Sequence, residues 1–350
     1  MTIDSILLAG DFSAGSLENS YKDAFESIGI RTYSFGTRGF HNRIQWTLLN
    51  RVARRIGSET LWFCQRASRA LNNSLQDAVL RAKVPAVLVI KGDLITGSTL
   101  RRIRASGVRV ACYFPDNPFP PHPSSRPGSL PAARETDLYL VWSKRLAGKL
   151  KHAGVANPVF LPFAWDSEVF PYASPQPQGT WPGVLFFGGW DREREEFLEE
   201  LACHLPLRIF GPDYWAKRTK ARSRVRACFQ GTGLQGAAAA KIIRESAITL
   251  NILRTQHIID GIPDGLIMRH FEVPGSGGFL LSTRGGGATD LFREGETGEY
   301  FTGMAECVEK AKKYIADKTA RRILVEQAHT EVALRHQYTH RAREILAMLQ

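Results

Sequence analysis

Apolar and polar residues follow two patterns in the first half of the chain. Short apolar runs alternate with longer stretches in which apolar residues recur every three or four positions. The runs are typical of buried strands and the stretches of amphipathic helices, and their alternation predicts βαβ units around a parallel sheet. The predicted strands are residues 5–9, 86–90, 108–114 and 138–141, and the predicted helices are residues 16–28, 44–56, 61–82, 97–105 and 143–153.

A proline-rich stretch interrupts this pattern at residues 171–182. It contains four prolines and no charged residue, a composition that continues neither a helix nor a strand. The alternation then starts again, which predicts a domain boundary here. Beyond it, the predicted strands are residues 183–187, 207–210, 248–253 and 278–282, and the predicted helices are 192–203, 237–246, 266–273, 305–316 and a long one from about Ala320.

These patterns predict an α/β protein of two Rossmann-like domains, each with a parallel sheet. A length of 350 residues suits two domains of about 150 residues each. Ligands of open α/β sheets bind at the carboxyl ends of the strands, so two such sheets facing across a cleft would form a ligand site. The expected parts are an N-terminal domain at 1–170, a linker at 171–182, a C-terminal domain at 183–328 and a terminal helix at 329–350 that could return to the first domain.

The composition is that of a globular protein, 43% hydrophobic and 23% charged. No apolar run approaches the about 18 residues of a membrane span, and the first run is too short for a signal peptide, so we expect a cytoplasmic protein. The five cysteines are scattered without Cys-x-x-Cys spacing, which predicts neither a disulfide framework nor a thiolate metal site. The net charge of +12 predicts an anionic partner, and nucleotide diphosphates, acidic glycans, phospholipid head groups and nucleic acids all qualify.

The segment from residue 251 to residue 283 carries the strongest candidate chemistry. Asp264 and Glu272 are separated by seven residues, and a helix between them would place both on roughly the same face, because eight residues make about 2.2 turns. Two carboxylates on one face can bind the vicinal diol of a ribose. Arg269 lies between them and would bring a guanidinium group to a diphosphate.

This segment resembles the Glu-x7-Glu signature of retaining GT-B glycosyltransferases, with Asp264 where that family usually has Glu. More closely, Arg269-His-Phe-Glu272, Gly277-Gly278-Phe-Leu-Leu and a tail from His329 to Arg341 are similar to the CgeB-like, or spore-maturation type, subgroup. Further similar pieces cover nearly the whole chain. They are residues 184–188 with Arg194, 207–211 and 249–252, and in the first half 91–92, 114–118 and 142–143.

The resemblance implies a transferase that moves a sugar from a UDP-, GDP- or dTDP-sugar to an acceptor, with retention of configuration and without a metal ion. Its donor site would lie in the second domain. Gly188 would let the chain approach the phosphates, and Arg192 or Arg194 would neutralise them. Glu272 would hold the ribose and Asp264 the donor sugar or ribose. The remaining implied residues are Arg254 and Arg269 for the diphosphate charge, with Asn251, Gly277 and Gly278 around the donor.

The first domain would then hold the acceptor, which could be a glycan, a lipid-linked saccharide, a protein or a small molecule. Gly15 lies in the loop between the first predicted strand and helix, where backbone amides often meet a ligand. Asp116 follows a predicted strand and could position or deprotonate an acceptor hydroxyl. The alternative is that Asp116 only caps a proline turn.

Three other signals have simpler explanations. Gly231-Thr-Gly233-Leu-Gln-Gly236 matches the G-x-G-x-x-G pattern of dinucleotide sites, but basic residues precede it instead of an apolar strand. His336 and His340 lie four residues apart on the predicted terminal helix without a third metal ligand nearby. The predicted helix at 44–56 has an apolar stripe flanked by arginines, so it either lies peripherally on an anionic membrane or packs on the sheet.

Two other functions compete with sugar transfer. A nucleotide-sugar epimerase could use the same two-domain fold. A basic nucleic-acid-binding or DNA-modifying protein could use the basic residues at 51–55 and 217–226. The sequence shows no recognised nucleic-acid-binding module, so we rank nucleic acid last among the partners.

Overall fold

The computed structural model describes residues 3–40, 62–119, 128–173 and 180–350. The chain divides into two compact units: unit 1 is Met1–Leu161 with Thr339–Gln350, and unit 2 is Pro162–Tyr338. The division between the units falls after Leu161, ahead of the proline-rich residues 171–182. Residues 339–350 return to the N-terminal unit. The predicted basic amphipathic helix at 44–56 lies outside the described residues.

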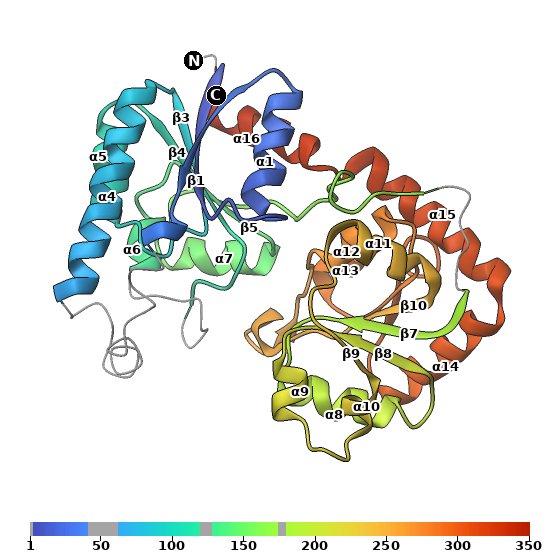
Figure 1. The fold of residues 1–350 in the computed structure, drawn as a ribbon. Helices are drawn as coiled ribbons and strands as arrows, with labels where there is room; N and C mark the ends of the chain where they lie inside the picture. Colours follow the sequence, from blue (N-terminus) through green and yellow to red (C-terminus); the bar gives the residue numbers. More distant parts are fainter. Residues whose placement is uncertain (1–2, 41–61, 120–127, 174–179) are drawn as a thin grey trace. The chain divides into compact units, whose positions relative to one another are not determined.

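Unit 1 is built on a six-stranded parallel sheet of order β2-β1-β3-β4-β5-β6. Helices α4 and α5 cover one face of the sheet, and α1 and α16 cover the other (Figure 1). The strand order reverses between β1 and β3. The strands are β1 Ser5–Gly10, β2 Arg31–Gly36, β3 Ala86–Ile90, β4 Arg109–Phe114, β5 Leu138–Val141 and β6 Pro158–Phe160. The helices are α1 Leu17–Ser27, α4 Trp62–Ala82, α5 Gly97–Ala105, α6 Ser129–Ala133, α7 Lys144–His152 and α16 Tyr338–Leu349.

Unit 2 has a second six-stranded parallel sheet, of order β14-β13-β10-β7-β8-β9. This is the strand order of dinucleotide-binding Rossmann sheets, which bind their ligand where the order reverses, here between β7 and β10. The strands are β7 Trp181–Phe187, β8 Leu207–Phe210, β9 Phe229–Gly231, β10 Ser246–Asn251, β13 Leu280–Thr283 and β14 Glu299–Phe301, with a hairpin of β11 Ile258–Ile259 and β12 Ile262–Pro263. The helices are α8 Arg192–Leu201, α9 Tyr214–Arg218, α10 Arg224–Cys228, α11 Gly236–Glu245, α12 Arg269–Gly275, α13 Gly286–Thr289, α14 Met304–Ala316 and α15 Lys318–Arg335.

The core of unit 2 lies on both faces of its sheet. Along β7, Val184 and Phe186 join one hydrophobic cluster, whereas Leu185 and Phe187 join another that contains Val273 of α12. Successive side chains of a strand point to opposite faces, and both faces are covered here, so the strand has a continuous apolar run. The alternation places Phe187, the last residue of β7, on the face that α12 covers.

Two predictions about the local structure are wrong. The terminal helix is broken into α15 and α16, because the carbonyl oxygen of His336 accepts a hydrogen bond of 2.7 Å from the backbone N–H of Trp165. His336 and His340 therefore do not lie on one helix. In addition, β9 ends at Gly231, so a short strand does precede the glycine-rich loop.

No helix in the described part of the chain is both long enough and apolar enough to cross a membrane.

Candidate functional site

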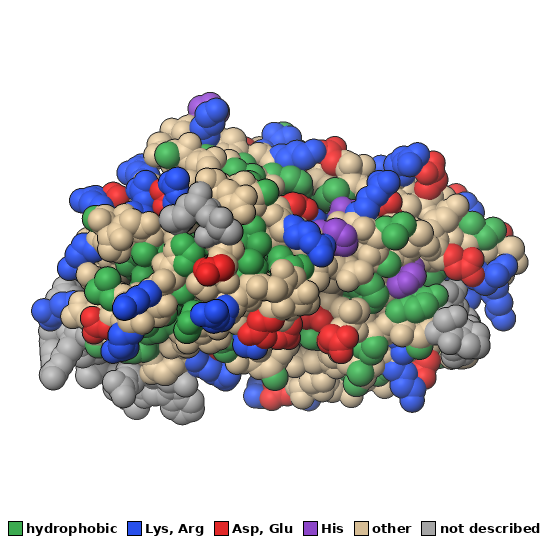
Figure 2. All heavy atoms as spheres, turned by 90° about the horizontal axis from the view of Figure 1, so that it is seen from above, with side chains coloured by type: hydrophobic (Ala, Val, Ile, Leu, Met, Phe, Trp, Pro, Cys, Tyr) green, Lys and Arg blue, Asp and Glu red, His purple; other side chains and the backbone are tan. Residues whose placement is uncertain are grey.

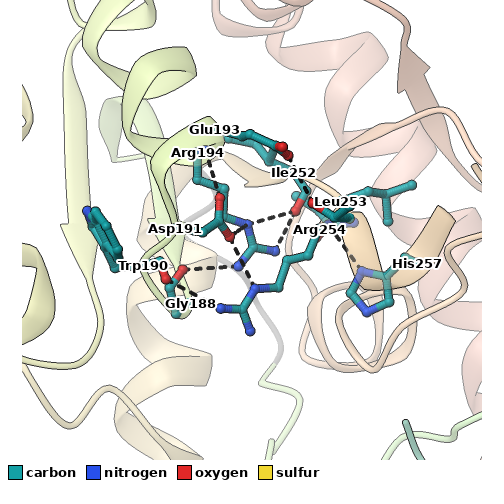
Figure 3. Close-up of polar contacts among 12 residues, drawn as sticks. Gly188, Trp190, Asp191, Glu193, Arg194, Ile252, Leu253, Arg254 and His257 are labelled. Atoms are coloured by element: carbon teal, nitrogen blue, oxygen red, sulfur yellow. Dashed lines mark hydrogen bonds and ion pairs between the residues drawn. The ribbon is translucent and has the colours of Figure 1, made fainter. Parts of the chain in front are cut away.

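The carboxyl ends of β7 and β10 carry two loops that are joined by one buried arginine (Figure 3). Residues 188–191 follow β7 and residues 252–254 follow β10. Arg194, on the first turn of α8, donates from Nε to the Ile252 carbonyl oxygen at 3.1 Å and from Nη1 to the Gly189 carbonyl oxygen at 3.1 Å. Its side chain is 6% exposed. Arg194 therefore holds the two loops together at the point where the strand order reverses.

Asp191 connects α8 to a second arginine. One carboxylate oxygen accepts from the backbone N–H of Arg194 at 2.9 Å and so caps α8, while the other accepts from Nε of Arg254 at 3.1 Å. The Arg254 guanidinium also lies against Gly189, where an added Cβ would be 3.1 Å from Nη2. The side chain of Arg254 remains 36% exposed.

A third arginine lies close to these two. Burial lowers the pKa of Arg194 to about 10, Asp191 opposes this shift, and the positive charges of Arg254 and Arg269 add to it. Arg194 is thus still charged at neutral pH. Three guanidinium groups at one end of a sheet form a cationic site, and guanidinium groups bind phosphate oxygens in a bidentate manner.

Arg269 and Glu272 form an ion pair on α12. The Arg269 guanidinium lies 3.7 Å from the centre of the Phe187 ring, and its Nη2 donates to the Phe187 carbonyl oxygen at 3.4 Å. Its Nε is buried and has no hydrogen-bond partner among the residues that the structure describes. Glu272 is only 4% exposed. The pair is therefore fixed beside the end of β7.

The prediction that Asp264 and Glu272 share one face of a helix is wrong. The hairpin β11–β12 leads directly to Asp264, and α12 begins only at Arg269. The backbone N–H of Ile267 donates to Nδ1 of His270 at 3.2 Å, which satisfies this group outside the helix. Asp264 is nevertheless buried, and its backbone N–H donates to the His257 carbonyl oxygen at 3.0 Å.

Several other predicted donor residues have structural contacts of their own. Arg192 is exposed on α8 and pairs with Glu196 at 2.8 Å. Asn251 is buried and donates from Nδ2 to the Ser282 hydroxyl at 2.9 Å. Gly188 donates its N–H to the Phe210 carbonyl oxygen at 3.0 Å. Of the donor residues predicted, the structure brings together Gly188, Arg194, Arg254, Arg269 and Glu272.

The predicted glycine turn between α12 and β13 is present. Gly277 has a φ of 87°, which favours glycine. Gly278 lies against Ile243 of α11, since an added Cβ would be 2.1 Å from its Cγ2. Both glycines therefore serve the passage of the chain into β13.

His270 should make the stability of the protein depend on pH. Its Nε2 lies 3.1 Å from the Ser282 hydroxyl, and burial lowers its pKa from about 6.5 to about 4. The folded state therefore binds the proton less well than the unfolded state. We expect the free energy of unfolding to fall as the pH decreases from about 6.5 to 4, by up to about 1.4 kcal/mol per pH unit from this group. Urea unfolding of the wild type and of His270→Gln at pH 7 and 5 measures this, and equal pH dependence of the two would contradict it.

Unit 1 has a cavity of about 330 Å³ at the carboxyl ends of β1, β2 and β3. It lies where the strand order of this sheet reverses, the usual place for a ligand. Lys91 lines the cavity with a left-handed backbone, φ 66°, which is strained for a residue other than glycine. Its Nζ contacts Asp116 at 3.1 Å and Asp93 at 3.7 Å. Gly15 also lies in unit 1, with φ 72° in the loop between β1 and α1.

On the face drawn in Figure 2, Lys and Arg side chains are scattered among Asp and Glu instead of forming one basic patch. In the described part of the chain, no group of three or more His, Cys, Asp or Glu side chains is placed to hold a metal ion.

Sequence reasoning missed Asp191 and Gly189. An Asp directly before a helical pattern is a known N-cap signal, so the cap could have been predicted. The contact with Arg254 could not, because 63 positions separate the two residues.

Comparison with known proteins agrees with this architecture. A family model described as glycosyl transferase-like matches residues 192–347, a stretch that contains Arg194, Arg254, Arg269 and Glu272. A search of curated protein sequences finds no match. Residues 192–347, most of the second unit, are therefore similar to this glycosyl transferase-like family.

Solved structures cover the whole chain at low sequence identity. Anabaena HepE in complex with UDP is 13% identical with a TM-score of 0.60, and each chain covers 99% of the other. Sucrose-phosphate synthase from Thermosynechococcus elongatus is 12% identical with a TM-score of 0.69, covering 98% of this chain and 97% of its own. A glycosyltransferase from Rickettsia africae is 10% identical with a TM-score of 0.66, covering 100% and 98%. The fold is thus that of GT-B glycosyltransferases, with two parallel-sheet α/β domains.

Proposed function

We propose that this protein is a glycosyltransferase that moves a sugar from a nucleoside diphosphate sugar to an acceptor. The observation that carries the proposal is the cluster of Arg194, Arg254 and Arg269 at the carboxyl ends of β7 and β10, with the buried Glu272 beside it. The family match over this stretch supports it. HepE has been solved with UDP and with UDP-glucose, which supports a nucleotide-sugar donor.

The contacts suggest a role for each side chain. Arg254 and Arg269 are partly exposed and would stabilise the negative charge of the diphosphate as the nucleotide leaves, usually the largest catalytic effect. Arg194 has its Nε and both Nη atoms bonded to backbone carbonyl oxygens and would support the site from beneath. Glu272 would bind the ribose and Asp264 the donor sugar. The resemblance to CgeB-like and other retaining enzymes supports transfer with retention.

Thermal unfolding in the presence of nucleotides tests the proposal. A ligand that binds only the folded state stabilises it by RT ln(1 + [L]/Kd), about 2.7 kcal/mol at a hundredfold excess over Kd. We expect at least one of UDP, GDP, dTDP and CDP to raise the unfolding temperature. The control variant is Arg322→Ala, which removes an exposed ion pair with Glu326 on α15 and should respond to the nucleotides like the wild type. Failure of all four nucleotides and their sugars to stabilise the wild type would overturn the proposal. Incubation with donor alone would reveal an epimerase by a change in the sugar.

We further propose that the arginines replace a metal ion at the diphosphate. Guanidinium groups fixed by Asp191 and Phe187 already supply positive charge at the ends of β7 and β10. The rate of nucleoside diphosphate release from the donor should therefore change less than about twofold when EDTA is added, an estimate that assumes no metal contribution to charge stabilisation. A loss that Mg²⁺ or Mn²⁺ restores would contradict this.

The acceptor is proposed to bind in unit 1, beside the cavity that Lys91 lines. Asp116, held by Lys91, would orient the acceptor hydroxyl. Asp116→Asn should lower kcat/KM for the acceptor by about tenfold or more, because one hydrogen bond to a charged group is lost. The Kd of the nucleotide should not change. Asp23→Asn, an exposed residue of α1, is the matched control. An equal loss in both variants, or a weaker nucleotide affinity in Asp116→Asn, would contradict the assignment.

A further inference from the structure

We propose that Asp191 is a positioning residue that holds Arg254 in the orientation needed to bind the donor diphosphate. This inference rests on the proposed function. Asp191 itself does not touch the donor; it acts through Arg254, which reaches the site from the other loop. The part of its effect that passes through Arg254 should therefore appear in nucleotide affinity.

The two oxygens of Asp191 have different partners. Oδ1 accepts from the backbone N–H of Arg194 and caps the start of α8. Oδ2 accepts from Nε of Arg254 at 3.1 Å and also lies 3.6 Å from Nε of the buried Arg194. Figure 3 shows Asp191 between the two arginines, with Arg254 extending from the loop after β10. The carboxylate thus connects the β7 loop to the β10 loop at the reversal of the strand order.

The remaining contacts of Arg254 define which of its edges is available. Nη2 donates to the Trp190 carbonyl oxygen at 3.4 Å, and Gly189 leaves room for the flat guanidinium to lie against the backbone. Nη1 makes no hydrogen bond to the residues that the structure describes. Asp191 therefore occupies the Nε side and leaves the terminal edge, formed by Nη1 and Nη2, for an anion. That edge is suited to bind two phosphate oxygens at once.

A second explanation is that Asp191 only caps α8, and substitution by asparagine separates the two. Asparagine caps helices as well as aspartate does. Its Oδ1 can keep the bond to the Arg194 N–H. An NH₂ group replaces Oδ2 and faces the Nε–H of Arg254, and because both groups are donors, the hydrogen bond to Arg254 is lost. Asp191→Ser gives a second variant that caps the helix but is too short to reach Arg254.

The experiment measures the Kd of UDP, GDP, dTDP and CDP by calorimetry, together with unfolding temperature. We expect Asp191→Asn and Asp191→Ser to keep the cap of α8 and to bind the preferred nucleotide about tenfold more weakly, or about 1.4 kcal/mol. Both variants also lose the ion pair with the buried Arg194, which should lower the unfolding temperature whether or not Arg254 is present. In an Arg254→Ala background, Asp191→Asn should cause no further loss. The matched control is Glu193→Gln. The exposed Glu193, on the first turn of α8, accepts from the Thr255 hydroxyl just beyond the β10 loop at 3.2 Å and does not touch Arg254.

The outcomes distinguish this inference from the proposed function. If the wild type binds one of the nucleotides and Asp191→Asn binds it equally well, the inference is overturned and the function stands. The same holds if Asp191→Asn weakens binding as much in the Arg254→Ala background as in the wild type. If the wild type binds none of the four, the proposed function fails, and this inference fails with it.

Discussion

Glu272→Gln should lower kcat/KM for the donor by about a hundredfold or more, in the range seen when one such catalytic or binding group is removed. Glutamine has the same size, so the buried position next to Phe271 and Val273 stays filled. It lacks the charge that pairs with Arg269 and that would accept the ribose hydroxyls. Initial rates of nucleoside diphosphate release from the donor, with unfolding temperatures in parallel, measure the effect.

The control for this variant is Glu326→Gln, which breaks an exposed pair with Arg322 on α15 and should leave the rate unchanged. Surface pairs of this kind contribute little to stability. A Glu272→Gln enzyme that keeps more than about a third of the wild-type rate would contradict the role given to Glu272. If Glu272→Gln greatly lowered the unfolding temperature but still bound the nucleotide with wild-type affinity, Glu272 would have a structural role instead.

Arg254→Ala should lower the same rate by about 100- to 1000-fold, the usual cost of one donor that stabilises developing charge. The residue is partly exposed, so its removal should leave the unfolding temperature without ligand nearly unchanged. Arg254→Lys keeps the charge but cannot place two N–H groups on one phosphate, so it should recover only part of the rate.

Arg322→Ala is the control for Arg254→Ala, because it also removes an exposed arginine, and it should leave the rate unchanged. If Arg254→Ala reduced the rate and the nucleotide affinity by less than about twofold, Arg254 would not contact the diphosphate. Recovery of full activity in Arg254→Lys would indicate that only charge is needed at this position.

The central strands were predicted well because their burial is visible in the sequence. Strands β3 and β5 have the predicted bounds, since every residue in them is buried and the run is continuous. Strand β2 was missed because it lies at the edge of the sheet and Arg31, Ser34 and Phe35 are not buried, so the apolar run is absent. Strand β14 was missed because Glu299 begins it, although the strand is buried.

The site was predicted in part, and the reason differs from residue to residue. Arg269 and Glu272 were proposed from their spacing and Arg254 from the resemblance, and the structure brings them to the ends of β7 and β10. The helical spacing of Asp264 and Glu272 failed because residues 264–268 are not helical and α12 begins only at Arg269. The long-range contact of Asp191 leaves no local pattern in a single sequence.

The division of the chain also has a consequence for biosynthesis. Helix α16 contributes Ala342, Ile345 and Leu349 to the buried core of unit 1, yet it follows the whole of unit 2 in the sequence. On the ribosome, unit 1 therefore keeps part of its hydrophobic core exposed until α16 has been synthesised. Unit 2, which is continuous, can mature earlier, so the nascent polypeptide finishes its two halves in the reverse of the order in which they begin.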